Sequence, residues 1–267
     1  HQLARDESLA ALTFPFAGYR PGQREMAVQA YTAIVQRRRL FASLPTGTGK
    51  SAAVLFPALK ALGLGKTRKL LYLTARNTAR QSPLNALERM RAQGMRARVT
   101  VLTAREKLCP DGACHLSDCP RAPGHYLRQR DAIDELLAMD ALWTDERIVR
   151  VADRHRICPF ELALALTELA DVVLMDYNYV FDPLAQVQRL AERRGHSTLL
   201  VDEAHHLLER AREMYSGQIA TRELARHRAE AGKACGRSHP YYKALGAVLR
   251  ALRALDLPAP AGAPGTP

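Results

Sequence analysis

The sequence predicts an α/β fold in which helices cover both faces of a parallel sheet. Short, nearly continuous apolar runs recur along the chain and alternate with helical patterns, which is typical of strands buried on both faces. A glycine-containing loop, LPTGTGKS at residues 44–51, follows the first run and opens a helix. With 267 residues, 47% of them hydrophobic, the chain can bury one large core, or one core plus an insertion.

The first half of the chain gives the clearest element signals. We expect a helix over residues 23–37, because apolar residues recur there at helical spacing and Pro21 precedes it as a start signal. The short apolar run Leu40–Leu44 is typical of a buried strand. The pattern then predicts a helix, a strand, a helix and a strand, in this order: 49–62, 69–74, 79–93 and 98–102.

The second half is less regular. A long stretch from Ala104 to about Pro159 shows no clear pattern and is predicted to be irregular, after which strands are expected at residues 171–175 and 198–202. Helical patterns follow as far as about residue 256. The ending, PAPAGAPGTP, predicts a flexible tail over 258–267, and with a start on His it suggests a piece of a longer protein.

The net charge of +12 points to a polyanionic partner. Residues 60–107 are the most basic part, with Glu88 and Glu106 as their only acidic residues. A solvated basic surface is the alternative, and charge does not choose between DNA and RNA. No apolar run reaches the roughly 18 residues that span a bilayer, and the start does not resemble a signal peptide, so we expect no membrane association and a cytoplasmic location.

The loop at residues 44–51 predicts a phosphate-binding site. A glycine turn between strand and helix lets backbone N–H groups and the helix N-terminus surround phosphate oxygens. Lys50 is expected to neutralise the β and γ phosphates of ATP, and the Ser51 hydroxyl to bind Mg²⁺. The strict pattern begins with Gly, where this chain has Leu44, and a plain glycine turn is the alternative. The expected nucleotide-binding residues are Pro45, Thr46, Gly47, Thr48, Gly49, Lys50 and Ser51.

A second signal, DEAH at residues 202–205, follows an apolar strand. A carboxylate at the carboxyl edge of a parallel sheet is well placed to hold Mg²⁺, and the next one to orient and deprotonate an attacking water. We therefore assign metal binding to Asp202, general-base catalysis to Glu203, and a place in the nucleotide site to His205. Alone, these four residues could begin an ordinary helix; paired with the phosphate loop, they indicate an ATPase.

Four cysteines between these motifs predict a metal site: Cys109, Cys114, Cys119 and Cys158. A disulfide is not expected in a cytoplasmic chain, and four thiols suit a soft metal. Their spacing differs from the paired arrangement of common zinc ribbons, and four thiolates also hold iron–sulfur clusters. His115 and His125 are possible substitutes as ligands, whereas Cys235 lies outside the group and is interpreted as an ordinary thiol.

Together these motifs resemble the XPD and DinG family of superfamily-two DNA helicases, from about Tyr19 to about Ser216. CPFELA at 158–163, DYNYVFDP at 176–183 and VDEAHHLLERAREMYS at 201–216 carry the resemblance. It implies a RecA-like, phosphate-loop motor domain over 1–103 and 160–210, interrupted at 104–159 by an insertion that holds a four-iron four-sulfur cluster with Cys158 as its last ligand. Residues 211–257 would open a helical arch domain, with two packing helices of the core as the alternative.

The resemblance also implies roles for single residues. Gln23 is similar to the glutamine that reads adenine in this family, and an amide can pair with both a ring nitrogen and the exocyclic amine; an ordinary helix-surface glutamine is the alternative. Thr74, Ala75 and Arg76 would touch the backbone of single-stranded DNA, although Arg76 could instead pair with a local carboxylate. Basic residues of the insertion would form a wedge beside the cluster: Arg121, His125, Arg128 and Arg130.

The function implied by the resemblance is ATP-dependent DNA unwinding, 5′ to 3′, with ATP, Mg²⁺ and the cluster as cofactors. The partners would be single-stranded DNA, DNA junctions and a second RecA-like domain of the same parent chain, which supplies an arginine finger. Without that domain, weak nucleotide binding and poor turnover are expected. Two other interpretations stay open: a metal-containing nucleic-acid-binding module with a degenerate ATPase, and an RNA-directed translocase. The pathway served and the oligomeric state are not readable from the residues.

Overall fold

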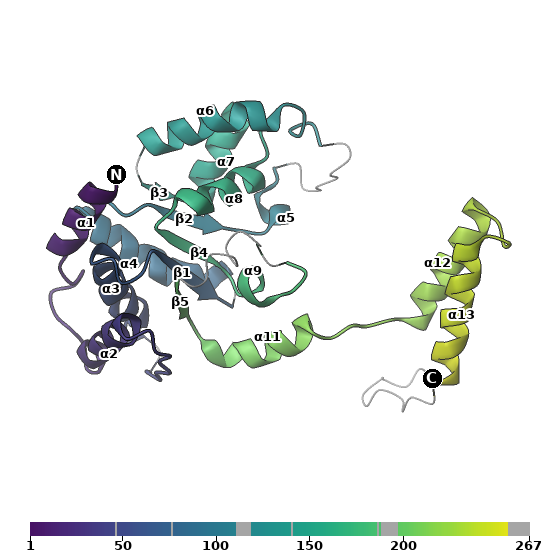
Figure 1. Ribbon diagram of the computed structural model, residues 1–267, viewed down its shortest axis with the longest axis horizontal. Helices are drawn as coiled ribbons and strands as arrows, with labels where there is room; N and C mark the ends of the chain where they lie inside the picture. The colour runs from purple at the N-terminus through teal and green to yellow at the C-terminus, as the bar shows by residue number, and fades with distance from the viewer. Residues whose placement is uncertain are drawn as a thin grey trace. The chain divides into compact units, whose positions relative to one another are not determined.

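A five-stranded parallel sheet lies at the centre of residues 1–215 (Figure 1). The computed structural model describes residues 1–45, 47–75, 77–110, 119–139, 141–185, 187 and 197–255. The strands are β1 (Lys69–Thr74), β2 (Val99–Leu102), β3 (Leu142–Trp143), β4 (Val172–Asp176) and β5 (Ser197–Val201). Their spatial order is β3-β2-β4-β1-β5, and the predicted α/β class with a parallel sheet is confirmed.

The strand register brings three strand ends to one edge of the sheet. β1 lies between β4 and β5, with Leu73 opposite both Met175 and Val201. Because all these strands run in the same direction, their carboxyl ends share one edge, where open α/β sheets bind ligands. The residues that follow β4 and β5 are therefore held next to those that follow β1.

One face of the sheet is covered by the helices that surround the phosphate loop. They are α1 (Gln2–Ala11), α3 (Lys50–Gly63) and α4 (Gln81–Ala92), the last entered through the 3₁₀ helix η1 (Asn77–Arg80); α2 (Gln23–Val35) packs against α3. Fully buried leucines of α3, such as Leu55 and Leu59, join Leu87 of α4 and alternate residues of β1, Leu70 and Tyr72. This alternation follows from the two-residue period of a strand.

The opposite face is covered by helices from the stretch predicted to be irregular, so that prediction is wrong. Residues 104–159 contain α5 (Arg105–Leu108), α6 (His125–Ala138), β3 and α7 (Asp145–Arg154), and α8 (Pro159–Leu169) follows, with α9 (Asn178–Phe181) after β4. Buried residues of α6, α7 and α8 pack on Leu71 and Leu73 of β1. The many Arg, Asp and Glu residues give this segment the composition of a solvated loop, yet α7 has an apolar face at helical spacing, with Ile148, Val151 and Ala152 buried.

The predicted strand Leu40–Leu44 is also wrong: the segment belongs to none of the described strands. Leu40 is 41% exposed and Phe41 is 88% exposed. A strand needs a neighbour for its backbone hydrogen bonds, and none of the described strands pairs with this segment. The other predicted strands and the helices of the first half are confirmed to within a few residues.

Beyond β5 the chain continues through η3 (Ala204–His206) and α11 (Leu207–Met214). A second compact unit begins at Ser216. It contains α12 (Thr221–Ala234) and α13 (Pro240–Ala254), which pack together through the Arg228 guanidinium, 4.4 Å from the centre of the Tyr242 ring. The predicted tail at 258–267 lies outside the described residues. No described helix is both long and apolar enough to span a membrane.

Candidate functional site

The phosphate loop leads into α3 with the geometry that an anion site requires. Gly47 and Gly49 have φ values of +78° and +77°, a region that favours glycine, and Gly49 is the N-cap of α3. The first N–H groups of a helix have no partner within it, so they are available to phosphate oxygens. The Thr48 hydroxyl donates to the Pro45 carbonyl at 2.8 Å, which closes the turn. Thr46 lies outside the described residues.

Arg20 and Gln23, at the start of α2, hold this loop through hydrogen bonds to its backbone. The Gln23 side chain is buried; its amide nitrogen donates to the Gly49 carbonyl at 3.2 Å and its oxygen accepts from the Arg20 backbone N–H at 2.7 Å. The Arg20 guanidinium donates to the Gly47 carbonyl at 2.6 Å. A Cβ at Gly49 would lie 2.5 Å from Gln23 Nε2, the end of a flexible side chain, so the positive φ of Gly49 is the stronger reason for glycine here. Adenine recognition by Gln23 stays a prediction, and the contacts of Arg20 were not predicted.

Lys50 and Glu203, far apart in the sequence, form an ion pair at the site. Lys50 Nζ donates to Glu203 Oε1 at 2.8 Å, and this contact holds the pKa of Glu203 below its usual value. Glu203 has a φ of +49°, a conformation that residues other than glycine seldom adopt. His205 Nδ1 lies 3.4 Å from Glu203 Oε2, and the His205 side chain is 66% exposed. The structure therefore brings Lys50, Glu203 and His205 together, and their roles at a nucleotide stay predictions.

A buried tyrosine connects the two residues predicted to bind Mg²⁺. Tyr72 Oη lies 3.2 Å from Ser51 Oγ and 3.0 Å from Asp202 Oδ2, and Ser51 Oγ is also 2.9 Å from Ser82 Oγ. Burial raises the pKa of Asp202, and the hydrogen bond from Tyr72 opposes that shift. Burial and the nearby Asp202 charge raise the pKa of Tyr72, so its hydroxyl keeps its proton at neutral pH. Tyr72 and Ser82 were not predicted, because Tyr72 reads in the sequence as one more apolar residue of the run KLLYLT.

A second tyrosine, Tyr177, fixes the backbone of the two carboxylate residues. Its hydroxyl donates to the carbonyl of Asp202 and lies 3.1 Å from the carbonyl of Glu203. Burial and the charges of Asp202 and Glu203 raise the pKa of Tyr177 to about 12, so it remains a donor. The Tyr177 hydroxyl therefore helps to hold the left-handed backbone at Glu203. Tyr177 belongs to the DYNYVFDP sequence, which thus has a structural role.

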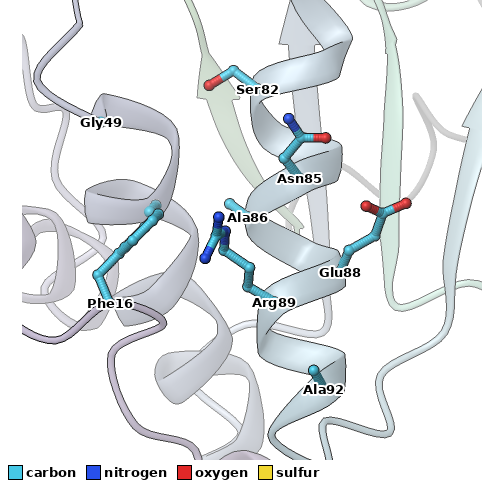
Figure 2. Close-up of a pocket in the computed structure, with 9 residues that line it drawn as sticks. Phe16, Gly49, Ser82, Asn85, Ala86, Glu88, Arg89 and Ala92 are labelled. Atoms are coloured by element: carbon cyan, nitrogen blue, oxygen red, sulfur yellow. The ribbon is translucent and has the colours of Figure 1, made fainter.

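A pocket of about 700 Å³ lies between α3 and α4, next to the phosphate loop (Figure 2). It is lined by Phe16, Gly49, Ala52, Ser82, Asn85, Ala86, Glu88, Arg89 and Ala92. The Arg89 guanidinium points toward the Phe16 ring, 5.0 Å from its centre, while Glu88 points away from that ring (Figure 2). Because Gly49 and Ser82 line it, the pocket belongs to the same site as the loop, and its volume is in the range of small-molecule pockets.

The residues predicted to contact DNA after β1 are only partly accessible. Thr74 is fully buried, with its hydroxyl directed at the Met175 carbonyl at 3.5 Å, and Arg76 lies outside the described residues. Arg80, from the basic stretch, is buried and donates to Thr103 Oγ1 at 2.6 Å; Thr103 in turn donates to Asp145 at 2.7 Å. Thr74 and Arg80 therefore form hydrogen bonds inside the protein. Part of the positive charge of residues 60–107 is thus buried and not on the surface.

Three of the four predicted cluster ligands are described, and all are half-buried free thiols: Cys109, Cys119 and Cys158. Cys109 follows α5, Cys119 precedes α6, and Cys158 is the N-cap of α8. Burial of the Cys158 thiol raises its pKa. The Cys158 N–H donates to His125 Nδ1 at 3.3 Å, which ties the start of α8 to α6. Free thiols are the right donors for an iron–sulfur cluster. Among the described residues, however, no three His, Cys, Asp or Glu side chains are assembled as a metal site, and Cys114 lies outside them.

The residues of the predicted basic wedge mostly contact other residues of the 104–159 stretch. Arg121 pairs with Asp153 at 3.0 Å, and Arg128 donates to the carbonyls of Pro123, His155 and Arg156. His125 is buried, and Arg130 is exposed. These contacts show how a strongly basic segment folds: its cations bind backbone carbonyls and one aspartate of its own structure. Cys235 is an exposed free thiol in the second unit, consistent with an ordinary cysteine.

The parallel sheet, the loop at the start of α3 and the Asp–Glu pair after β5 define a RecA-like phosphate-loop domain of the nucleoside triphosphatase class. The sequence matches the family described as DEAD_2 over residues 76–224, and the DEAD/DEAH box helicase family over residues 22–109. The chain belongs to the DEAD_2 family, and its resemblance to the XPD and DinG helicases is confirmed.

Curated relatives include the human "Regulator of telomere elongation helicase 1", 25% identical over 171 residues, which are 59% of this chain and 14% of the human protein. The homologue from Drosophila mojavensis is 24% identical over 233 residues, or 82% of this chain and 23% of that protein. The homologue from Aedes aegypti is 36% identical over 80 residues, 30% of this chain and 8% of that protein. This chain thus corresponds to less than a quarter of each of these relatives.

Solved structures show the same fold. "XPD_Helicase" superposes with a TM-score of 0.59 at 16% sequence identity, covering 91% of this chain and 42% of the other. "Truncated XPD" superposes with a TM-score of 0.55 at 18% identity, covering 85% of this chain and 64% of the other. At this identity the likeness establishes the fold alone.

Proposed function

We propose that this chain is the nucleotide-binding part of an ATP-dependent DNA helicase. The observation that carries the proposal is the junction of the phosphate loop with the Asp–Glu pair: Lys50 contacts Glu203, and Ser51 and Asp202 both contact Tyr72. These are the parts that phosphoryl transfer to water needs at one place. Relatives named as helicases support unwinding as the activity.

Each residue then has a distinct task. Lys50, at the start of α3, binds the β and γ phosphates, and this draws it away from Glu203. Glu203, released from the ion pair and ionised at neutral pH, orients the attacking water and accepts its proton. Ser51 and Asp202 offer a hydroxyl and a carboxylate oxygen, which are donors that suit Mg²⁺. When bound, the ion would neutralise charge that develops on the phosphates.

We infer that the intact helicase uses a second RecA-like domain that supplies an arginine finger, and that it translocates 5′ to 3′ on single-stranded DNA at junctions. Support comes from the family and from the short coverage of each relative. The domain limits 104–159 and 211–257 and a cytoplasmic location remain predictions. A degenerate ATPase is disfavoured because loop, lysine and carboxylates are all present and in contact.

The test is ATP hydrolysis by the full-length protein with single-stranded DNA or RNA of one sequence. We expect hydrolysis to rise with the DNA and to change little with the RNA, and a DNA duplex with a 5′ single-stranded end to be unwound. Stimulation by RNA alone would favour an RNA-directed translocase, and no hydrolysis at all would favour a binding module. Unwinding by residues 1–267 alone would contradict the need for a second motor domain.

We also propose that Cys109, Cys114, Cys119 and Cys158 hold a four-iron four-sulfur cluster. The thiol donors and the position of Cys158 at the helix start in CPFELA support this. Anaerobically purified protein should be brown and should contain iron and acid-labile sulfide in about equal amounts. Replacing Cys158 with Ser should remove most of both, because the cluster would lose one thiolate. Cys235→Ser is the matched control and should keep them; a colourless protein with stoichiometric zinc would refute the cluster.

A further inference from the structure

We propose that Tyr72 is a positioning residue that sets Ser51 and Asp202 in the arrangement that binds Mg²⁺. This rests on the proposed function, because it assigns the metal to the same site. No sequence motif pointed to Tyr72; the contact geometry alone does.

The hydroxyl of Tyr72 reaches the site from inside the core. Tyr72 is 3% exposed and lies on β1, where it is paired in register with Leu174 of β4 and Leu200 of β5. Its side chain packs in the core cluster on the α3 side of the sheet. Strands on both sides therefore fix its backbone, and close packing fixes its ring. The hydroxyl is held in place without help from any mobile surface group.

The two hydrogen-bond distances place one oxygen between the two metal-binding side chains. Tyr72 Oη is 3.0 Å from Asp202 Oδ2 and 3.2 Å from Ser51 Oγ. A phenol has one proton, so it donates to one partner at a time, and the carboxylate is the stronger acceptor. Tyr72 thus holds Oδ2 of Asp202 and helps to select the orientation of the carboxylate.

The same phenol oxygen can also accept the hydroxyl proton of Ser51. A serine hydroxyl that gives a lone pair to a metal ion must direct its proton to another acceptor. Two acceptors lie within reach of Ser51 Oγ, namely Tyr72 Oη at 3.2 Å and Ser82 Oγ at 2.9 Å. With its own proton on Asp202, Tyr72 is free to accept the proton of Ser51. One hydroxyl therefore prepares both ligands, a supporting role that generally strengthens metal binding.

The test separates metal positioning from a purely structural role. Binding of a fluorescent ATP analogue to residues 1–267 is titrated twice, with Mg²⁺ and with EDTA, and the ratio of the two dissociation constants gives the gain from Mg²⁺. Tyr72→Phe removes only the hydroxyl oxygen and should reduce this gain by about 10-fold or more, the typical cost of losing a partner of a metal ligand. Its affinity in EDTA should match that of the unmodified chain.

Controls make the outcomes decisive. Tyr179→Phe removes a hydroxyl from a tyrosine of α9 and should leave the gain unchanged. Tyr72→Met removes the hydroxyl with a different shape, and it should show the same reduced gain, so a packing defect in one variant does not decide the result. An unchanged gain in both Tyr72 variants, or equal losses with Mg²⁺ and with EDTA, would overturn the inference. Absence of nucleotide binding by the unmodified chain would instead overturn the proposed function and the inference with it.

Discussion

Lys50→Ala is expected to weaken ATP binding to this chain by roughly 100-fold. Lys50 is the only side-chain cation of the loop between residues 44 and 51, and hydrogen bonds to charged groups contribute about 1.5–3 kcal/mol, so losing its contacts with two phosphates costs about 3 kcal/mol. Alanine also leaves Glu203 without its 2.8 Å partner, which places a free carboxylate near the phosphates. Titration with a fluorescent ATP analogue and Mg²⁺ measures the change.

Lys60→Ala is the matched control for this variant. Lys60 lies on the same helix, α3, but at its other end, where it donates to the Ala10 carbonyl at 2.6 Å. Both variants remove one lysine from one helix, so a nonspecific effect of net charge or helix propensity would appear in both. We expect only Lys50→Ala to lose affinity. Equal affinities of Lys50→Ala and the unmodified chain would contradict the assignment of the phosphate site.

Glu203→Gln is expected to reduce ATP hydrolysis by the full-length protein by about 10²- to 10⁴-fold, the usual contribution of a positioned general base. ATP binding should persist. A glutamine oxygen at position 203 can still accept the hydrogen bond from Lys50, so the contacts of the phosphate loop in the absence of nucleotide are kept. Steady-state hydrolysis with saturating single-stranded DNA gives the rate, and a nucleotide titration of the same sample gives the affinity.

The control for Glu203→Gln is Glu209→Gln. Glu209 is an exposed carboxylate on α11, the helix that follows the DEAH residues, and it takes part in no described contact with the loop. The Glu209→Gln variant should hydrolyse ATP at the same rate as the unmodified protein. If Glu203→Gln retained full hydrolysis, another group would have to act as the base, and the catalytic role given to Glu203 would be wrong.

The sequence allowed the motor part of the fold to be predicted because its signals are local. Strands such as β1 and β4 are continuous apolar runs, and the phosphate loop combines glycines, a lysine and a serine in a fixed order. Short-range patterns of this kind depend on backbone geometry more than on distant contacts. The meeting of Lys50 with Glu203 was predictable for the same reason, since parallel strands end at one edge.

What could not be predicted depends on residues far apart in the sequence. Tyr72 reads as one more apolar residue of β1 until Asp202 and Ser51 are seen beside it. The helices α6 and α7 lie in a highly charged segment whose composition favours a loop, although a few of its apolar residues face the core. Leu40–Leu44 has the composition of a strand but no partner among the described strands, and composition alone cannot show whether a partner is present.

The position of the cysteines has a practical consequence for handling the protein. Cys119 and Cys158 flank α6 and α7, and these helices together with α8 supply the hydrophobic cover of one sheet face. The stretch also leaves β2 and returns to β4, its direct neighbour in the sheet. If the proposed cluster binds both cysteines, its loss in air would remove a link between the two ends of this helical layer. We therefore expect anaerobic handling to keep the protein more stable, although the cysteines lie outside the nucleotide site.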